Sequence, residues 1–369
     1  MSDKAAIRAE AARLQAVFTD AGAVAVEADM LLPADTLLDL YGEDIRARAY
    51  VTDDADRGEM MLRPDFTVPV VQMHMAGGAE PARYTYMGEV FRKQPAGSGR
   101  PSEYLQVGYE IFDRADPIAA DAEVFALFSD ALAPLNLRAV TGDIGVLLAA
   151  VETLSTTQAR KAALRRHIWR PRRFRALLDR YTGRTAPPAA RVALIDAVNA
   201  QGVEAVLTGA GPMTGLRTED EIAARLHALA EDATTPPISA AEAEVLGVLL
   251  SLKAMLPDAY QQLRDVCVDL PGLSPAVDRF AARIDALSKA GVAVDALPFE
   301  ASYGRTNMEY YDGFVFGFVV EGRPDLPPVA TGGRYDALTR VLGGGREIPA
   351  VGGVLRPELI HRIAGEAKP

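Results

Sequence analysis

Residues 84–112, YTYMGEVFRKQPAGSGRPSEYLQVGYEIF, decide how this chain is expected to fold. Two segments of strand-like composition flank a basic loop, residues 93–102, that is rich in Gly and Pro. In the second segment apolar or aromatic residues alternate with Gln106 and Glu110, and the side chains of a strand point to opposite faces in turn. We therefore predict a hairpin with one face packed on a core and one polar face, with Arg92 at the start of the loop.

The composition is that of an ordinary folded protein. The chain has 369 residues, of which 49% are hydrophobic and 24% are charged, and these values are typical of globular domains. No apolar run approaches the roughly 20 residues of a membrane span, and no secretory signal opens the chain, so we expect a cytoplasmic protein. The single Cys267 and four scattered histidines have no metal-ligand spacing, so we expect neither a structural metal nor a cofactor.

Charge argues against a nucleic-acid partner, with one local exception. The net charge is −11 and the pI is near 5.0, which opposes binding of a polyanion. Within residues 160–184, however, nine Arg and one Lys accompany a single acid, Asp179. A tRNA contact, an anionic partner surface and a solvated helix face all fit this run. Trp169 and Phe174 lie within it and favour a docked helix with arginines at its rim.

The order of strand and helix signals predicts two parts. Strands and helices alternate up to about residue 150, and strand-like segments return after residue 293. The sequence between them is helical, with capping boxes such as Thr218 with Glu221. We predict a strand-rich core formed by residues 1–154 and 293–369, interrupted by a helical insertion of residues 155–292.

A short motif, LRPDFT at residues 62–67, follows an apolar strand. Pro64 can start a helix, which would place Asp65 and Thr67 at a corner between a strand and a helix. An acid in a first turn more often interacts with the helix dipole than with a ligand. Both interpretations are open for Asp65 on these residues alone.

Two further motifs lie near the C-terminus. Residues 304–313, GRTNMEYYDG, precede a predicted strand with three Phe residues on one face. Paired tyrosines just before such a strand are usually core residues. Residues 329–336, VATGGRYD, contain adjacent glycines that would let the backbone approach a ligand.

The order of these motifs resembles the class II aminoacyl-tRNA synthetases and, within them, the histidyl-tRNA synthetase family. The hairpin of residues 84–112 is similar to motif 2 of that class. Residues 62–67 are similar to the family pattern Leu-Arg-Pro-Glu-x-Thr, with Asp65 in place of Glu. Residues 304–313 are similar to the pattern Arg-Gly-Leu-Asp-Tyr-Tyr, and residues 329–336 to the pattern Ala-Gly-Gly-Arg-Tyr-Asp. The resemblance implies an α+β fold, with a mainly antiparallel sheet flanked by helices.

The chain departs from the synthetase pattern where ATP would react. Thr306 stands at the family's catalytic arginine position, with Arg305 beside it, and Leu359 stands at the motif 3 arginine that clamps the γ-phosphate. Losing one preorganised donor typically costs a factor on the order of 10² to 10³ in rate, so we do not expect efficient adenylation. Eleven residues follow Glu358, so we also expect no anticodon-binding domain.

A core of this kind resembles the family of ATP phosphoribosyltransferase regulatory subunits. The resemblance implies a non-catalytic chain that joins a short-form ATP phosphoribosyltransferase catalytic subunit in the first step of histidine biosynthesis. It also implies histidine feedback, and a homodimer built near Pro33 within a larger hetero-oligomer. The alternatives are an active histidine-adenylating enzyme, or an orphan ligase or tRNA-binding module supported only by the basic run.

The resemblance also implies a set of contacts to histidine and no catalytic residue. Asp65 and Thr67 would hold the amine, and Gln106 with Arg305 the carboxylate. The imidazole would meet one carboxylate and aromatic walls. Expected around the imidazole are Glu110, Tyr310, Tyr311 and Tyr335, and candidate anion contacts are Arg92 and Arg100.

Overall fold

A computed structural model of the protein describes residues 4–366 except 42, 96, 213, 214, 216 and 306–309. The chain divides into two compact units. The first, here called the sheet unit, comprises Met1–Val146, Ser251–Arg264 and Pro275–Pro369, and the second, the helical unit, comprises Leu147–Leu250 and Asp265–Ser274. The expected division into a core of residues 1–154 and 293–369 and a helical insertion of residues 155–292 stays a prediction.

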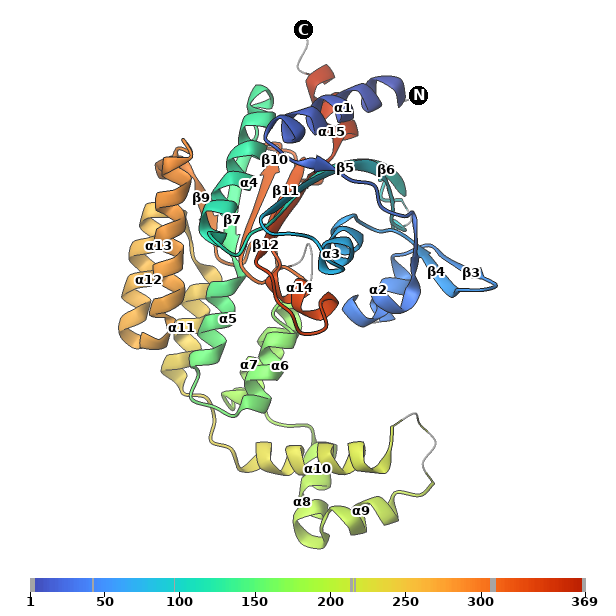
Figure 1. Ribbon diagram of the computed structural model, residues 1–369. Coiled ribbons are helices and arrows are strands. Elements are labelled where there is room, and N and C mark those ends of the chain that lie inside the picture. The colour runs from blue at the N-terminus through green and yellow to red at the C-terminus, as the bar shows by residue number, and fades with distance from the viewer. Residues whose placement is uncertain are drawn as a thin grey trace. The chain divides into compact units, whose positions relative to one another are not determined.

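A nine-stranded sheet forms the centre of the sheet unit (Figure 1). Two neighbouring pairs, β1 with β5 and β7 with β9, are parallel, and the other pairs are antiparallel. This confirms the α+β class with a mainly antiparallel sheet. Across the sheet the strands are β1 (Val24–Ala25), β5 (Ala82–Phe91), β6 (Glu103–Phe112), β12 (Ala350–Leu355), β11 (Ala330–Arg334), β10 (Phe314–Val319), β7 (Arg138–Asp143), β9 (Pro298–Glu300) and β8 (Lys253–Met255).

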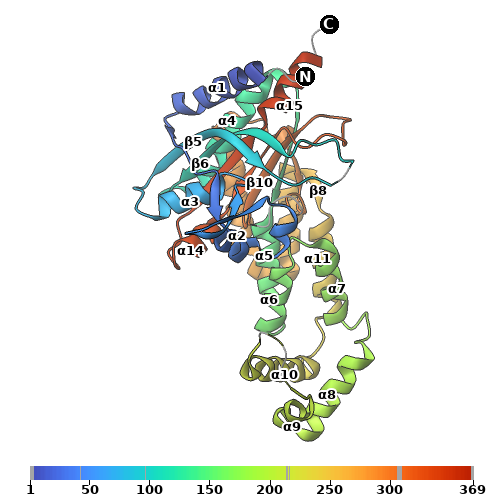
Figure 2. The ribbon, with the colours of Figure 1, turned by 90° about the vertical axis from the view of Figure 1, so that its right-hand side faces the viewer.

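Helices cover both faces of this sheet (Figures 1 and 2). Helices α1, α4 and α15 pack against one face, where α1 contacts β5 and β6, and α4 contacts β12. Helix α14 packs against β12 and against α3 on the other face. The bounds are α1 (Lys4–Asp20), α3 (Thr67–Met75), α4 (Pro117–Leu132), α13 (Ser274–Lys289), α14 (Asp336–Leu342) and α15 (Pro357–Glu366), with 3-10 turns at Ala133–Leu135 and Val294–Ala296.

A smaller three-stranded sheet has the order β2-β4-β3. Its strands pair antiparallel, and an apolar cluster that includes Leu37 and Met61 joins it to the neighbouring helix. The elements are β2 (Leu31–Pro33), β3 (Val51–Asp54), β4 (Gly58–Leu62), α2 (Ala34–Tyr41) and a 3-10 turn at Glu43–Ala47.

The predicted alternation in the β5–β6 hairpin is confirmed. Tyr109 lies on the apolar face, and its ring stacks on Phe18 of α1 with centroids 5.0 Å apart. Gln106 and Glu110 lie on the opposite face, and both are 1% exposed. Gly108 lies directly opposite Tyr86. A Cβ atom at position 108 would come within 2.1 Å of the Tyr86 ring, so only glycine lets this ring lie across β6.

Aromatic side chains of β10 fill the core beneath α4, as their spacing predicts. Phe316 packs edge-on against Phe125 and Phe128, with ring centroids 5.6 and 5.5 Å apart. Phe314 and Phe318 extend the same face and also contact Phe125. Core residues of this kind dominate the burial of apolar area that stabilises a sheet against its covering helices.

The helical unit consists of short helices with strong N-terminal signals. The capping boxes expected at Thr218 with Glu221 and at Ser239 with Glu242 are both formed. Helices α5 (Ile144–Thr153) and α12 (Leu256–Asp269) extend across the boundary between the units. The others are α6 (Gln158–Arg166), α7 (Pro171–Tyr181), α8 (Ala189–Gln201), α9 (Val203–Gly209), α10 (Glu219–Thr234) and α11 (Ala240–Ser251), with a 3-10 turn at Pro271–Leu273.

No helix among the described residues is both long and apolar enough to span a membrane.

A buried ionic network ties four elements of the sheet unit together. Arg283 of α13 donates to Asp121 of α4 at 2.8 Å and to Asp143 of β7 at 2.6 Å. Arg334, at the end of β11, donates to the other oxygen of Asp121 at 2.7 Å. Burial opposes the charge of Arg283, but the two carboxylates outweigh it and raise its pKa. Removing one member would leave uncompensated charge in the interior.

We predict that Arg283→Ala lowers the free energy of unfolding by about 3–5 kcal/mol, because Asp121 and Asp143 lose their shared cation. Urea unfolding measures the change. Arg279→Ala is the matched control, since Arg279 is an exposed arginine of the same helix, and it should shift stability by less than about 0.5 kcal/mol. Equal effects of the two substitutions would contradict this role.

Candidate functional site

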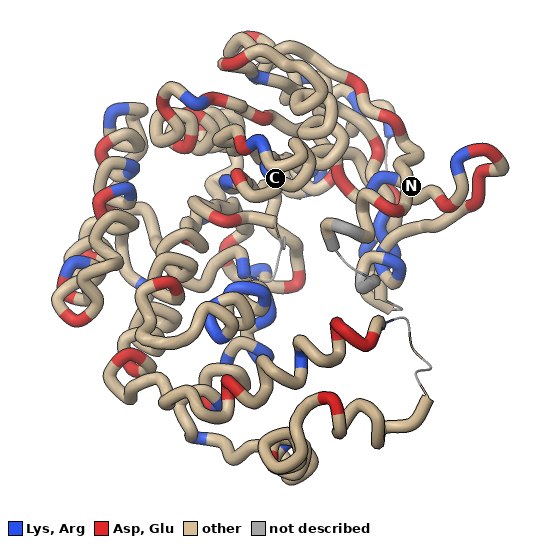
Figure 3. The backbone as a smooth tube through the Cα atoms, turned by 60° about the horizontal axis from the view of Figure 1, so that its bottom comes forward, with Lys and Arg blue, Asp and Glu red and all other residues tan. Residues whose placement is uncertain are grey.

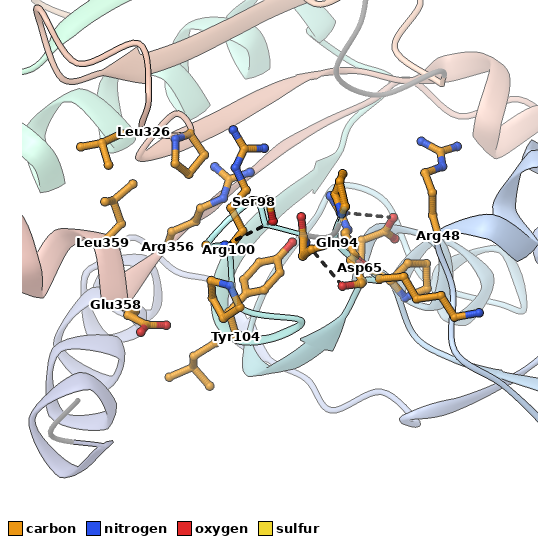
Figure 4. Close-up of a pocket in the computed structure, with 18 of the residues that line it drawn as sticks. Arg48, Asp65, Gln94, Ser98, Arg100, Tyr104, Leu326, Arg356, Glu358 and Leu359 are labelled. Carbon is orange, nitrogen blue, oxygen red and sulfur yellow. Dashed lines mark hydrogen bonds and ion pairs between the residues drawn. The ribbon is translucent and has the colours of Figure 1, made fainter. Parts of the chain in front are cut away.

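A cavity of about 1160 Å³ opens beside the β5–β6 hairpin in the sheet unit (Figure 4). The hairpin loop, the first turn of α15 and the segment of residues 325–327 contribute to its wall. More cations than acids line it, so the cavity is electropositive in a protein of net charge −11. The charged lining residues are Arg48, Arg92, Lys93, Arg100, Arg356 and Arg362 against Asp65, Asp325 and Glu358.

Arg92 and Asp65 meet at one wall of this cavity. The Arg92 Nε atom donates to the carbonyl of Pro64 at 2.7 Å, and its Nη2 atom lies 3.9 Å from Oδ2 of Asp65. Oδ1 of Asp65 accepts a long bond of 3.4 Å from the backbone amide of Val68. The helix begins at Thr67, so the start expected near Pro64 was wrong by three residues. The Asp65 carboxylate thus supports the helix start and also faces the cavity.

Arg356 brings a second cation to the cavity wall. Its guanidinium donates to the carbonyl of Pro328, and no acid pairs with it in the described part of the chain. Burial lowers its pKa. Leu359, which stands at the motif 3 arginine position, is 6% exposed and lines the same cavity. An arginine is therefore present near the expected phosphate clamp, but three residues earlier in the chain.

A buried carboxylate, Glu110, is the hydrogen-bond acceptor for three hydroxyl groups. Thr67 of α3 and Tyr86 of β5 donate to Oε1 at 3.0 and 2.8 Å, and Tyr335 donates to Oε2 at 2.6 Å. Burial raises the pKa of Glu110 to about 7, although the three hydroxyl donors favour the charged form. Near neutral pH this group can therefore exist as an acceptor or as a donor.

The other expected residues lie on or near the same face. Tyr310 packs against Tyr311 and Tyr335, with ring centroids 5.0 and 6.0 Å apart. Gln106 is buried, and its Oε1 atom has no hydrogen-bond partner among the described residues. Arg305 is 5% exposed, and Thr306 lies outside the described residues.

The structure brings together part of the predicted site. Thr67, Glu110 and Tyr335 are in direct contact, but they do not line the cavity of about 1160 Å³. Asp65 lines that cavity, as do the candidate anion contacts Arg92 and Arg100. The predicted amino-acid contacts and the electropositive cavity are therefore neighbouring regions of the β5–β6 face, linked at the corner that carries Asp65 and Thr67.

Sequence reasoning missed Tyr86. Its ring lies across Gly108, which has no side chain to exclude it, and this pairing depends on a hairpin register that the sequence pattern does not determine. The structure gives a packing reason for Gly332. A Cβ atom there would lie 2.3 Å from the Phe316 ring and 2.5 Å from the Gly352 carbonyl. This glycine therefore permits close packing within the sheet, and the expected approach of the backbone to a ligand stays a prediction.

Within the described ranges, no group of three or more His, Cys, Asp or Glu side chains is arranged to hold a metal ion.

Comparisons with known proteins identify a family profile and curated relatives. A profile described as histidyl-tRNA synthetase matches residues 2–236 and 219–360. Proteins of Brucella canis and Brucella suis described as ATP phosphoribosyltransferase regulatory subunits are 34% identical over 360 residues, covering 92% of this chain and 93% of theirs.

Solved structures show the same fold. A Bacillus halodurans protein described as an ATP phosphoribosyltransferase regulatory subunit/histidyl-tRNA synthetase has a TM-score of 0.67 at 20% identity, covering 98% of this chain and 79% of that one. The histidyl-tRNA synthetase of Nostoc has a TM-score of 0.64 at 16% identity, covering 99% and 73%.

We predict that Glu110 makes stability fall as pH rises from about 4.5 to 7. The folded protein retains a proton that the unfolded chain has released in this window, because the pKa of Glu110 is raised from 4.5 to about 7. The loss is on the order of 3 kcal/mol. Urea unfolding at pH 5 and 7.5 measures it in the native protein and in Glu110→Gln.

The variant should lose less stability than the native protein between these two pH values. Asp312, whose pKa burial also raises to about 7, is present in both proteins, so the difference isolates Glu110. The same pH dependence in both proteins would contradict the assignment.

Proposed function

The chain belongs to the family of ATP phosphoribosyltransferase regulatory subunits, and from this premise we propose that it binds free histidine and transmits this signal to a catalytic subunit. The observation that carries the proposal is the buried Glu110 carboxylate among hydroxyl and aromatic groups, on the same face of β6 as the unpartnered acceptor of Gln106. A buried polar atom without a partner is rare in folded proteins. A ligand with an ammonium group would supply the missing donor.

The residues suit the three polar parts of histidine. Asp65 provides an anion for the α-ammonium group, and the Oε1 atom of Gln106 provides an acceptor. Arg305 provides a cation for the carboxylate, which bidentate guanidinium groups recognise well. Glu110 provides an acceptor for an imidazole N–H group, with the rings of Tyr310 and Tyr335 as aromatic neighbours.

We propose that the chain does not itself adenylate histidine. Leu359 is an apolar, buried residue at the place where a synthetase clamps the γ-phosphate. Phosphoryl-type chemistry depends on cations fixed around the transferred group. The chain would instead act within a cytoplasmic hetero-oligomer, as a homodimer formed near Pro33, joined to a short-form catalytic subunit. Arg92 and Arg100 would then serve an anion that binds without reacting.

The alternative is an active histidine-adenylating enzyme. One observation favours it: the cavity of about 1160 Å³ is lined by Arg92, Arg100 and Arg356, and is large enough for a nucleotide beside the amino-acid contacts. Histidine-dependent exchange of pyrophosphate into ATP separates the two functions. We expect no exchange above background with the isolated chain or with the complex, and clear turnover would establish the alternative.

We predict that histidine binds the assembled complex and that Asp65→Asn weakens binding by about 10- to 100-fold, since hydrogen bonds to charged groups contribute about 1.5–3 kcal/mol. Titration calorimetry measures the affinity. Asp325→Asn is the control, because Asp325 is an exposed acid that lines the cavity and pairs with Arg323. It should leave the affinity within about twofold. Absence of heat from histidine with both the isolated chain and the complex would refute the proposal.

A further inference from the structure

Basic residues of the helical unit gather on α6, on α7 and just beyond them, as the blue segments of Figure 3 show. We propose that this surface docks an acidic, carboxylate-bearing face of the catalytic partner subunit. The proposal rests on the proposed function, which supplies the partner. The name α6–α7 arginine surface is used below for Arg166, Arg172, Arg173, Arg175 and Arg184.

Some arginines of the run have structural roles and are not part of this surface. Arg160 is 6% exposed and donates to Asp232 of α10 at 2.5 Å, and its guanidinium stacks on Tyr181. Arg191 of α8 binds the second oxygen of the same aspartate at 2.5 Å. Arg165 pairs with Glu152 at 2.8 Å. These contacts hold helices of the unit together, and each of these arginines has an acid as its partner.

The five residues of the α6–α7 arginine surface differ from these. All are exposed, and none has an ion pair with an acid in the described part of the chain. His167 lies among these cations. Burial is the main cause that lowers its pKa, and the nearby charges of Arg170, Arg173 and Arg166 lower it further. The positive charges of this region are therefore close together without a compensating acid.

Two of the arginines occupy unfavourable positions for helix stability. Arg172 and Arg173 follow Pro171 in the first turn of α7, where the helix dipole is positive and favours acids. A solvated helix face would not require cations there. A surface that breaks a local rule without a local compensation is expected to serve a function.

The type of cation favours a protein partner. Nine of the ten cations between residues 160 and 184 are arginine. Arginine binds carboxylates in a bidentate way and is enriched at protein interfaces, whereas lysine is depleted there. An acidic protein face is therefore the partner that this composition fits.

RNA fits less well. Single-stranded nucleic acids stack on exposed aromatic rings, but no aromatic ring of this run is exposed: Phe174 and Tyr181 of α7 are buried, and Trp169 is half-buried. The net charge of −11 also opposes the approach of a long polyanion.

The test compares two double charge reversals. Arg172→Glu with Arg173→Glu removes two cations of the surface, and the acids favour the first turn of α7, so the helix should stay folded. Arg225→Glu with Arg279→Glu is the control, because both arginines are exposed and unpaired in the described chain. The two variants change the net charge equally.

Binding of the catalytic subunit is measured by interferometry at low and high salt. We expect the Arg172/Arg173 reversal to weaken association about tenfold or more at low salt and to reduce its salt dependence, mainly through a slower on-rate. The control should stay within about twofold of the native chain. The neutral pair Arg172→Gln with Arg173→Gln should fall between the native chain and the reversal.

The outcomes separate this inference from the proposed function. Native binding that the Arg172/Arg173 reversal leaves unchanged overturns the docking surface but not the regulatory role. Absence of binding by the native chain overturns both. Retained partner binding with loss of binding to bulk tRNA would assign the surface to RNA and overturn the proposal.

Discussion

The desolvated carboxylate of Glu110 is the constraint around which the polar face of the sheet is arranged. Burying a charge is costly unless donors surround it, and three different elements supply them: α3, β5 and the residue that follows β11. Each element must stay in register for its hydroxyl to reach. The same contacts therefore fix the start of α3 at Thr67 and the placement of Tyr335.

Charge is distributed unevenly in a way that suits regulation without chemistry. The chain is acidic overall, yet arginines outnumber acids in the cavity of the sheet unit, and exposed arginines collect on α6 and α7 of the helical unit. Buried Arg283, by contrast, is matched by Asp121 and Asp143. If histidine binds one assembly state better than another, linkage requires that assembly changes histidine affinity by the same factor. A separate ligand site and partner surface are what such coupling needs.

Much of the fold follows from local sequence periods. The alternation of β6, the aromatic face of β10 and the capping boxes depend on residues two to four apart, so the sequence predicts them. The contacts of Tyr86 and the pairing of Arg283 with Asp121 depend on residues 24 and 162 positions apart. No local pattern encodes such distances. Helix α3 begins at Thr67, after Phe66, and not near Pro64 as the sequence predicted. The packing of Gly332 depends on the Phe316 ring of the neighbouring strand, which the local sequence does not show.

Inhibition of the reconstituted complex by histidine tests the central claim most directly. Catalytic turnover of the partner subunit is measured over a histidine series with the native chain and with Asp65→Asn. The account predicts that turnover depends on the chain, that histidine inhibits it, and that the variant requires at least about tenfold more histidine for the same inhibition. Identical inhibition curves for the native chain and the variant would place the histidine sensor elsewhere in the complex and contradict the account.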